Sequence, residues 1–237
     1  MKYVSDKTGR FQRRPHYEPR ELDDECDRIV NEFLKSKHGT VKFPISTDDL
    51  TCLIERDAAD LDLYADLSRE GQDVQGVTDF YPKGKPRVRI ARELSTEASR
   101  ENRLRTTLTH EYGHVRFHDY VWKLDLNPAD MLKEIPSKVS PKCNRNALLD
   151  APPTDWMEWQ AGYISGAMLM PLSAVLKLAA DYSQRKNVFA PVATDSNHGH
   201  ELRNILVESF KVSDEAARVR LLKLNLLSGR ELGPSLF

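Results

Sequence analysis

The residues with the clearest chemical potential are two histidines and a glutamate in the run HEYGH at positions 110–114. On an α-helix, His110 and His114 would project from one face a single turn apart, the spacing that lets two imidazoles bind one metal ion. Glu111, beside the first histidine, would reach a water molecule rather than the metal. The spacing therefore predicts a zinc hydrolase in which Glu111 is the catalytic general base.

The neighbouring residues must place this motif on a helix, and their pattern is helical. Leu104, Leu108 and Val115 give the predicted helix at 99–119 an apolar stripe beside the histidines. Glycine at position 113 makes a helix less stable than alanine would, by roughly 1 kcal/mol. Its presence there is best explained if another backbone approaches it closely. The alternative, two ordinary histidines on a helix, would require other partners for any buried imidazole.

A catalytic zinc ion needs a third protein ligand and keeps one position open. Glu158 is the best-placed candidate because it opens a second predicted helix in DWMEWQAGYISGAMLMP, residues 155–171. Ala161, Gly162 and Ser165 on that helix form a small-residue face that would let two helix backbones come close. The alternative for Glu158 is a solvated carboxylate in a first helical turn.

Three further side chains compete for the third ligand position. His118 lies one turn past His114, so imidazoles at positions 110, 114 and 118 would spread over roughly 12 Å of helix axis. That length is too great for one tetrahedral ion, which predicts a role for His118 beside the ligands or in packing. Asp150 and Asp155 are weaker rivals because they fall in or beside a loop.

The bulk composition limits the classes of protein and partner. A chain of 237 residues with 40% hydrophobic content can bury one substantial core with a helical appendage. The 35 basic and 36 acidic side chains nearly cancel, so no overall charge favours nucleic acid or an anionic membrane. No apolar run resembles a signal peptide or a membrane span. We therefore expect a cytoplasmic protein with no membrane partner. The cysteines lack the CxxC spacing of a thiolate zinc site, so we expect buried thiols at Cys26, Cys52 and Cys143.

The wider hydrophobic pattern predicts an α+β fold that is mainly helical. Before the HExxH helix, residues alternate in polarity with a period of two, which predicts a small antiparallel sheet. That alternation covers residues 61–67, 77–81 and 88–90. The remaining apolar residues recur at helical spacing, which predicts helices at 19–39, about 46–58, 155–170, 172–184, about 200–210 and about 213–227.

Three regions are expected along the chain. Residues 1–18 are rich in lysine and arginine and show no helical or strand period, which predicts a flexible basic arm. Residues 19–184 would form the metal-binding domain, with an irregular stretch at 127–154 that could shape a groove or cap one end. Residues 185–237 would form a helical C-terminal region.

In two long stretches the chain resembles the ImmA/IrrE-type zinc metallopeptidases, and a third stretch adds weaker support. The stretches are RLRTTLTHEYGHVRFH, EWQAGYISGAMLMP and FKVSDEAARVRLLKLNLL, which all lie within residues 45–227. The resemblance implies a zincin-like domain with a zinc ion held by His110, His114 and Glu158. It also implies cleavage of a specific helix-turn-helix repressor rather than bulk peptide. The family often has asparagine where this chain has Gly162, a change that leaves the ligand set intact.

A peptidase of this kind also needs a hydrogen-bond donor for the oxyanion of the transition state. His118, Tyr163, His198 and His200 carry suitable groups, and the sequence leaves the choice among them open. Zinc is the expected cofactor, and a protein is the expected substrate.

The C-terminal region supports a hypothesis of a different class. Two apolar helical patterns flank KVS at 211–213 in the manner of a helix-turn-helix. Arg218, Arg220 and Lys223 on the second helix, together with the basic arm, would suit DNA. The alternative function is therefore a DNA-binding regulator with a structural or sensory metal and no proteolytic activity. We favour the simpler interpretation of two amphipathic helices packed on a peptidase core, which leaves DNA as the less favoured partner.

Overall fold

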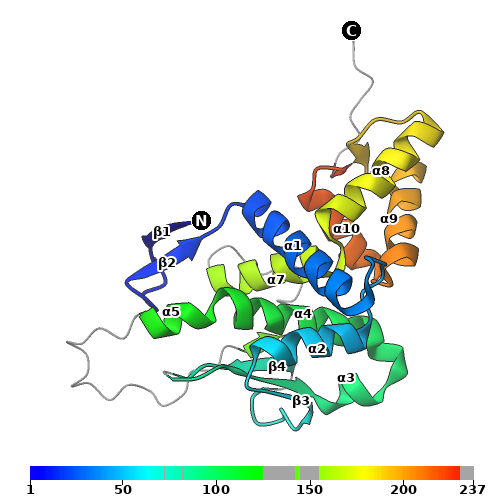
Figure 1. Cartoon of the computed structure of the whole chain (residues 1–237). Helices are drawn as coiled ribbons and strands as arrows, with labels where there is room; N and C mark the ends of the chain where they lie inside the picture. Colours follow the sequence, from blue (N-terminus) through cyan, green and yellow to red (C-terminus); the bar gives the residue numbers. More distant parts are fainter. Residues whose placement is uncertain (72, 82, 125–141, 145–154, 230–237) are drawn as a thin grey trace. The chain divides into compact units, whose positions relative to one another are not determined.

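The computed structural model has the expected α+β fold, with many helices and a few short strands (Figure 1). The main sheet precedes the helix that carries the two histidines, as the sequence predicted, although one of its strands, β6, comes from later in the chain. The residues that the structure describes are 1–71, 73–81, 83–124, 142–144 and 155–229.

The chain divides into two compact units. Unit 1 comprises residues 1–25 and 46–165, and unit 2 comprises residues 26–45 and 166–237. Two helices, α1 (Pro19–His38) and α7 (Trp156–Leu169), have residues in both units. This division differs from the boundary expected near residue 185, because α8, which follows α7, is grouped with the C-terminal helices.

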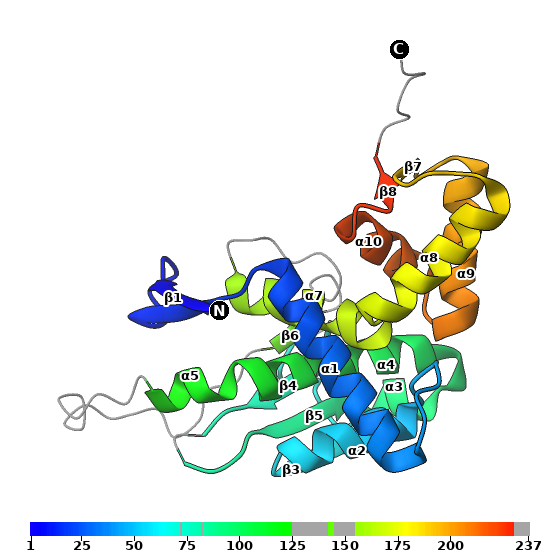
Figure 2. The ribbon, with the colours of Figure 1, turned by 45° about the horizontal axis from the view of Figure 1, so that its top comes forward.

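Unit 1 contains a four-stranded mixed sheet with the strand order β3-β5-β4-β6, and Figure 2 shows these strands side by side. β4 pairs antiparallel with β5 and β6, as expected, but β3 pairs with β5 in parallel. The expectation of a purely antiparallel sheet was therefore wrong for this pair. The reason is that β5 lies between β3 and β4, a placement that a period-two pattern does not encode. The strands are β3 (Asp60–Ala65), β4 (Val74–Asp79), β5 (Arg87–Ala91) and β6 (Lys142–Asn144).

The helix that carries HEYGH is α4 (Glu101–Phe117), within the predicted range of 99–119. It packs against β4 of the sheet and against α2 (Figure 1). α2 begins after Ser46, whose hydroxyl accepts a hydrogen bond from the Asp49 backbone at 3.0 Å, as expected for an N-cap. The elements around α4 are α2 (Thr47–Asp57), α3 (Arg92–Thr96), a 3-10 turn at Ala98–Arg100 and α5 (Asp119–Leu124).

The N-terminal residues, expected as a flexible basic arm, instead form a β-hairpin. β1 (Lys2–Ser5) and β2 (Arg13–His16) pair antiparallel. Phe11 in the connecting turn is 5% exposed and belongs to an apolar cluster with Trp156, and burying a phenylalanine contributes about 1.5–3 kcal/mol. The arm prediction failed because each strand is too short for a visible period and the contacts that order it are distant in the sequence.

Unit 2 holds the C-terminal helices. α9 (Asn197–Phe210) packs against α10 (Asp214–Lys223) and α8 (Leu172–Lys186). Two short strands, β7 (Val192–Ala193) and β8 (Leu227–Ser228), pair in parallel. The last helix is shorter than predicted because the chain after α10 turns and enters β8.

The sequence predicted buried thiols and no segment that spans a membrane. Cys26 is buried and Cys52 is exposed, so the expected burial holds for the first of these thiols and not for the second. The side chain of Cys143 lies outside the described part of the structure. In the described part of the chain, no single helix has the length and apolarity to cross a membrane, although α7 and α8 pass that test as a bent pair.

Candidate metal centre

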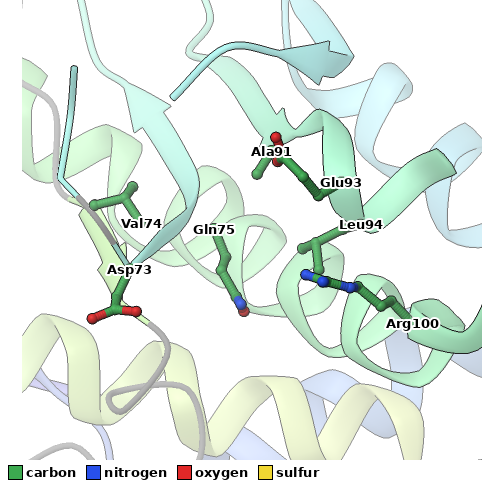
Figure 3. Close-up of a pocket in the computed structure, with 7 residues that line it drawn as sticks. All are labelled: Asp73, Val74, Gln75, Ala91, Glu93, Leu94 and Arg100. Carbon is green, nitrogen blue, oxygen red and sulfur yellow. The ribbon is translucent and has the colours of Figure 1, made fainter. Parts of the chain in front are cut away.

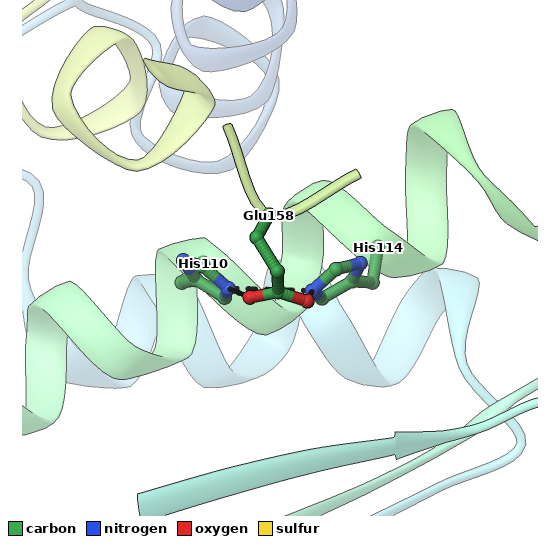
Figure 4. A group of neighbouring side chains, drawn as sticks. All are labelled: His110, His114 and Glu158. Carbon is green, nitrogen blue, oxygen red and sulfur yellow. Dashed lines mark hydrogen bonds and ion pairs between the residues drawn. The ribbon is translucent and has the colours of Figure 1, made fainter. Parts of the chain in front are cut away.

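Three side chains that could bind a metal ion meet in unit 1, two from α4 and one from α7. His110 and His114 are fully buried, and Glu158 in the first turn of α7 is 9% exposed. Figure 4 shows the Glu158 carboxylate directed between the two imidazoles. The structure thus brings together the three residues that the sequence suggested as metal ligands.

The distances among these side chains match those of a tetrahedral metal site. Nε2 of His110 lies 3.1 Å from Oε2 of Glu158 and 3.3 Å from Nε2 of His114. Nε2 of His114 lies 3.3 Å from Oε1 of Glu158. Zinc bonds of about 2.0–2.2 Å at tetrahedral angles place neighbouring ligand atoms about 3.3–3.5 Å apart. Two imidazoles and one carboxylate, with one oxygen facing each ring, therefore offer the donor types and about the spacing that a metal ion such as zinc requires.

Helices α4 and α7 come close because small residues line their contact. A Cβ added at Gly113 would lie 3.2 Å from Cα of Ala161, which is tighter than ordinary packing allows. One turn earlier on α4, the Thr109 hydroxyl lies 2.8 Å from the hydroxyl of Ser165. Gly113 therefore has the function that its poor helix propensity suggested: it lets the α7 backbone approach the helix that carries the histidines.

The electrostatics of the buried cluster favour a charged Glu158. Burial raises the pKa of its carboxyl, but His114 and His110 outweigh burial and hold that pKa well below its usual range. Burial also lowers the pKa of His114, yet the Glu158 carboxylate outweighs this effect, so the net pKa of His114 is raised. The carboxylate is thus in the anionic form that a metal ion requires of a ligand.

Glu111 is fully buried and is held in place by β4. Thr78 donates a hydrogen bond to its Oε2 atom at 2.5 Å, and burial raises the pKa of the carboxyl. Gly76 leaves the space that this carboxylate occupies, because a Cβ there would lie 2.9 Å from Cδ of Glu111. Sequence reasoning missed Thr78 and Gly76. The available signal was a glycine inside a strand, which often marks a close approach.

His118 contacts the Nδ1 side of the His114 ring, opposite the Nε2 atom that faces the other triad residues. The Nδ1 atoms of the two rings are 3.0 Å apart, and Nε2 of His118 lies 3.0 Å from Oε1 of Gln160. Burial lowers the pKa of His118 to about 3, so this ring is neutral near pH 7. The structure thus places His118 next to His114, and its role there stays a prediction. Gln160, two residues after Glu158, is a contact that the sequence did not reveal.

The other candidate oxyanion donors have partners of their own. Tyr163 donates its hydroxyl to Asp23 at 2.7 Å. His198 and His200 lie on α9 in unit 2, and Nδ1 of His198 is 2.7 Å from the Tyr182 hydroxyl. Of the four candidates, only His118 is therefore placed by the structure next to a member of the triad.

Of the two aspartates considered as rival ligands, Asp155 is described, and it does not join the triad. Asp155 has a side chain that is 36% exposed, and it pairs with Arg10 at 3.5 Å. Asp150 and most of the irregular stretch at 127–154 lie outside the described residues. Glu158 is therefore the carboxylate that completes the cluster.

A cavity of about 210 Å³ opens beside the start of β4, next to the strand residues that contact Glu111. Figure 3 shows the side chains of Gln75 and Arg100 facing this space. Oε1 of Gln75 has no hydrogen-bond partner within the described residues. The lining is polar and carries both charges, and it contains none of the triad residues; its other members are Asp73, Val74, Ala91, Glu93 and Leu94.

The helix pair that resembles a DNA-binding motif presents little free positive charge. Arg220 is 1% exposed, and its Nε atom donates to the Met170 carbonyl at 3.1 Å. Arg218 forms an ion pair with Glu215 at 2.7 Å. Asp214 and Glu215 also occupy the first turn of α10, where negative charge disfavours a phosphate. Arg220 is therefore buried, and Arg218 is paired with a carboxylate.

Comparison of the chain with models of protein families, with curated proteins and with solved structures gives no match. The assignment of the site therefore rests on the geometry of the described residues. A buried cluster of two histidines and a glutamate is compatible with a metal centre of the HExxH-plus-Glu type.

Proposed function

We propose that this protein is a zinc-dependent endopeptidase. The observation that supports the proposal most is the spacing at the triad: the Nε2 atoms of His110 and His114 lie 3.3 Å apart, and each lies 3.1–3.3 Å from one of the two Glu158 carboxylate oxygens. Three protein ligands leave one position of a tetrahedral zinc ion open, which is typical of catalytic sites, whereas structural zinc sites have four protein ligands. A buried glutamate fixed beside the triad supplies the second requirement of a hydrolase, a general base.

The residues around the site divide the chemistry among them. A zinc ion at the triad supplies Lewis acidity, which polarises a carbonyl and makes water a nucleophile near neutral pH. Glu111 accepts a proton from the attacking water and later delivers it to the leaving amine. Among the described residues only its Oε2 atom has a partner, Thr78, which leaves Oε1 available for this proton. Burial raises the pKa of the carboxyl, which suits a group that must take up and release a proton near pH 7.

The substrate class comes from the resemblance to ImmA/IrrE-type metallopeptidases. Members of that family cut helix-turn-helix repressors, and the same class of regulatory protein is the substrate proposed for this chain. Such regulators act in the cytoplasm, which is the compartment proposed for this enzyme.

The test is cleavage of a helix-turn-helix regulator encoded next to this gene. Co-expression with the wild-type protein should remove the intact regulator, and a zinc chelator should restore it. A Glu111→Gln protein should still bind zinc, because Glu111 is not a ligand, yet it should cut at least about 100-fold more slowly because the general base is lost. Cleavage at the wild-type rate by Glu111→Gln would rule out the assigned mechanism.

A DNA-binding regulator is the alternative function, and the charges on α10 weigh against it. Arg220 is buried, and Arg218 is paired with Glu215. Binding to DNA that weakens steeply with added salt would support the regulator. No measurable binding at low salt would remove it.

A further inference from the structure

A chain of hydrogen-bonding groups leads from His114 away from the metal-binding atoms. Nδ1 of His114 lies 3.0 Å from Nδ1 of His118, whose Nε2 lies 3.0 Å from Oε1 of Gln160. Nε2 of Gln160 donates to the Pro15 carbonyl at 3.2 Å. Both histidines are fully buried and Gln160 is 1% exposed. Each polar atom therefore depends on its neighbour in the chain for a hydrogen bond.

The Pro15 carbonyl fixes which group donates and which accepts in each of these hydrogen bonds. A carbonyl can only accept, so Gln160 presents its amide N–H to Pro15 and its own carbonyl oxygen to His118. His118 must then carry a proton on Nε2. A buried imidazole next to a neutral amide stays neutral, so Nδ1 of His118 is an acceptor. The proton between the two rings consequently belongs to Nδ1 of His114, so in the neutral His114 ring Nε2 is the nitrogen with the lone pair.

We propose that His118 and Gln160 are positioning residues that hold His114 in the tautomer required for metal binding. Nε2 of His114 is the atom that lies 3.3 Å from both His110 and Glu158. Only an unprotonated imidazole nitrogen binds a metal ion. The inference rests on the metal-binding part of the proposed function and does not depend on peptidase activity.

The two ligand histidines differ in this support. Nδ1 of His110 is buried and has no hydrogen-bond partner in the part of the chain that the structure describes. Nδ1 of His114, in contrast, begins the chain that ends at Pro15. Partners of this kind fix the orientation and tautomer of a metal-binding imidazole, and losing one typically costs about 10–100-fold in metal affinity. His114 is therefore the ligand that is prepared before the ion binds.

The last link gives the N-terminal hairpin a role at the metal centre. Pro15 is buried in β2, where it pairs with Tyr3 of β1. Its carbonyl is the group that orients the Gln160 amide, because the amide could otherwise rotate and offer its N–H to His118. That rotation would reverse the tautomer of His118 and, through it, that of His114. The hairpin thus sets the protonation of a metal ligand through Gln160 and His118.

The first test measures zinc affinity by competition with a chromogenic chelator. Gln160→Met preserves the size of the side chain but removes the amide, so zinc should bind about 10–100-fold more weakly. Gln75→Met is the matched control: it is the same exchange in unit 1 at a residue whose Oε1 has no partner among the described residues, and its zinc affinity should equal that of the wild type. Thermal unfolding of the metal-free proteins checks that both variants are folded.

The second test reads the tautomers by ¹⁵N NMR of the histidine rings. In the wild type, with or without zinc, His118 should carry its proton on Nε2 and leave Nδ1 unprotonated. In Gln160→Met this preference should be lost or reversed. Unchanged zinc affinity and an unchanged tautomer in this variant overturn the inference, and so does an equal loss of affinity in Gln75→Met. A wild-type protein that binds no zinc contradicts the proposed function itself, which is a different result.

Discussion

Helix α4 in unit 1 buries 13 of its 17 residues, whereas helix α10 in unit 2 buries four of its ten. The N-cap residue of α4, Arg100, makes no capping hydrogen bond with its side chain. α10 begins after Ser213, whose hydroxyl accepts a hydrogen bond from the Ala216 backbone at 3.2 Å. Local sequence therefore accounts for much of the stability of α10, through its cap, its apolar face and its exposed ion pairs. α4 depends on its neighbours, because polar groups buried on every side need partners from other elements.

The partners of α4 show what this difference means for function. Several of its buried polar side chains bind groups on β4, α2 and α7, such as Thr78 for Glu111 and Asp57 for Tyr112. Burying and pairing so many polar groups costs stability that an apolar helix would not lose. The burial of polar groups on α4 is best explained by the candidate metal centre that it carries, whereas packing alone explains a capped amphipathic helix.

The largest effect is expected from removing Glu158, the third of the proposed metal ligands beside α4. Glu158→Ala takes one of three donors from the metal centre, so zinc affinity should fall by more than about 100-fold, beyond the usual effect of losing an outer partner. Asp155→Ala is the control, because this nearby carboxylate pairs with Arg10 instead. Chelator competition measures both proteins. Equal zinc affinities in the two variants would contradict the assignment of Glu158.

Replacing two helical glycines should have opposite effects on stability. Gly113→Ala on α4 places a Cβ 3.2 Å from the Ala161 backbone, and such overpacking costs about 1–3 kcal/mol. Gly166→Ala on α7 meets only the Arg220 side chain, at 3.8 Å. Alanine there should stabilise the helix by up to about 1 kcal/mol. Thermal unfolding midpoints should therefore shift in opposite directions, and shifts of the same sign would weaken the comparison.

Removing the cap of α10 should have an effect of about 1 kcal/mol. Ser213→Ala deletes the acceptor for the Ala216 backbone, and losing an N-cap typically costs this amount. Ser213→Asp keeps an acceptor and should remain close to the wild type. Urea unfolding, followed by helical circular dichroism, measures the difference. No loss in Ser213→Ala would mean that packing rather than local sequence holds α10.

The smallest effect is expected from Asp57, which binds the Tyr112 hydroxyl of α4 at 2.8 Å. Burial raises the pKa of the Asp57 carboxyl, but hydrogen bonds from Arg56 and Tyr112 outweigh burial, so the net pKa is below the usual 3.8. A depressed pKa in the folded protein stabilises it above pH 4, and this contribution is lost as the pH falls through the folded value. For a partly exposed pair it is on the order of 1 kcal/mol or less.

The measurement for Asp57 is urea unfolding of the wild type and of Asp57→Asn at two pH values. The wild type should be the more stable protein at pH 7. The difference should shrink toward pH 3, where the carboxylate takes up a proton. A difference that does not change with pH would show that the aspartate acts by packing and not by charge.

Much of the fold and the core of the site could be predicted from the sequence. The helical period around HEYGH placed His110 and His114 on one face, and Gly113 indicated that another backbone comes close. The small residues after Glu158 indicated the partner helix. These predictions succeeded because each depends on spacing within a single helix, where 3.6 residues per turn fixes the direction of every side chain.

The predictions that failed depended on contacts between distant parts of the chain. The hairpin at residues 2–16 was expected as a flexible arm, and the parallel pairing of β3 with β5 was not expected. Neither Phe11 nor the order of strands leaves a periodic signal, because both are decided by what the segment packs against and not by its own residues.

By itself, then, the sequence determined the metal-binding residue types and the helices that carry them. Only the tertiary structure decided what surrounds them: Thr78 on Glu111, 33 residues away in the chain, and the Pro15 carbonyl on Gln160, 145 residues away. The physical reason is that a helix fixes the direction of its own side chains, whereas a buried polar atom takes its partner from whichever element the fold brings within about 3 Å.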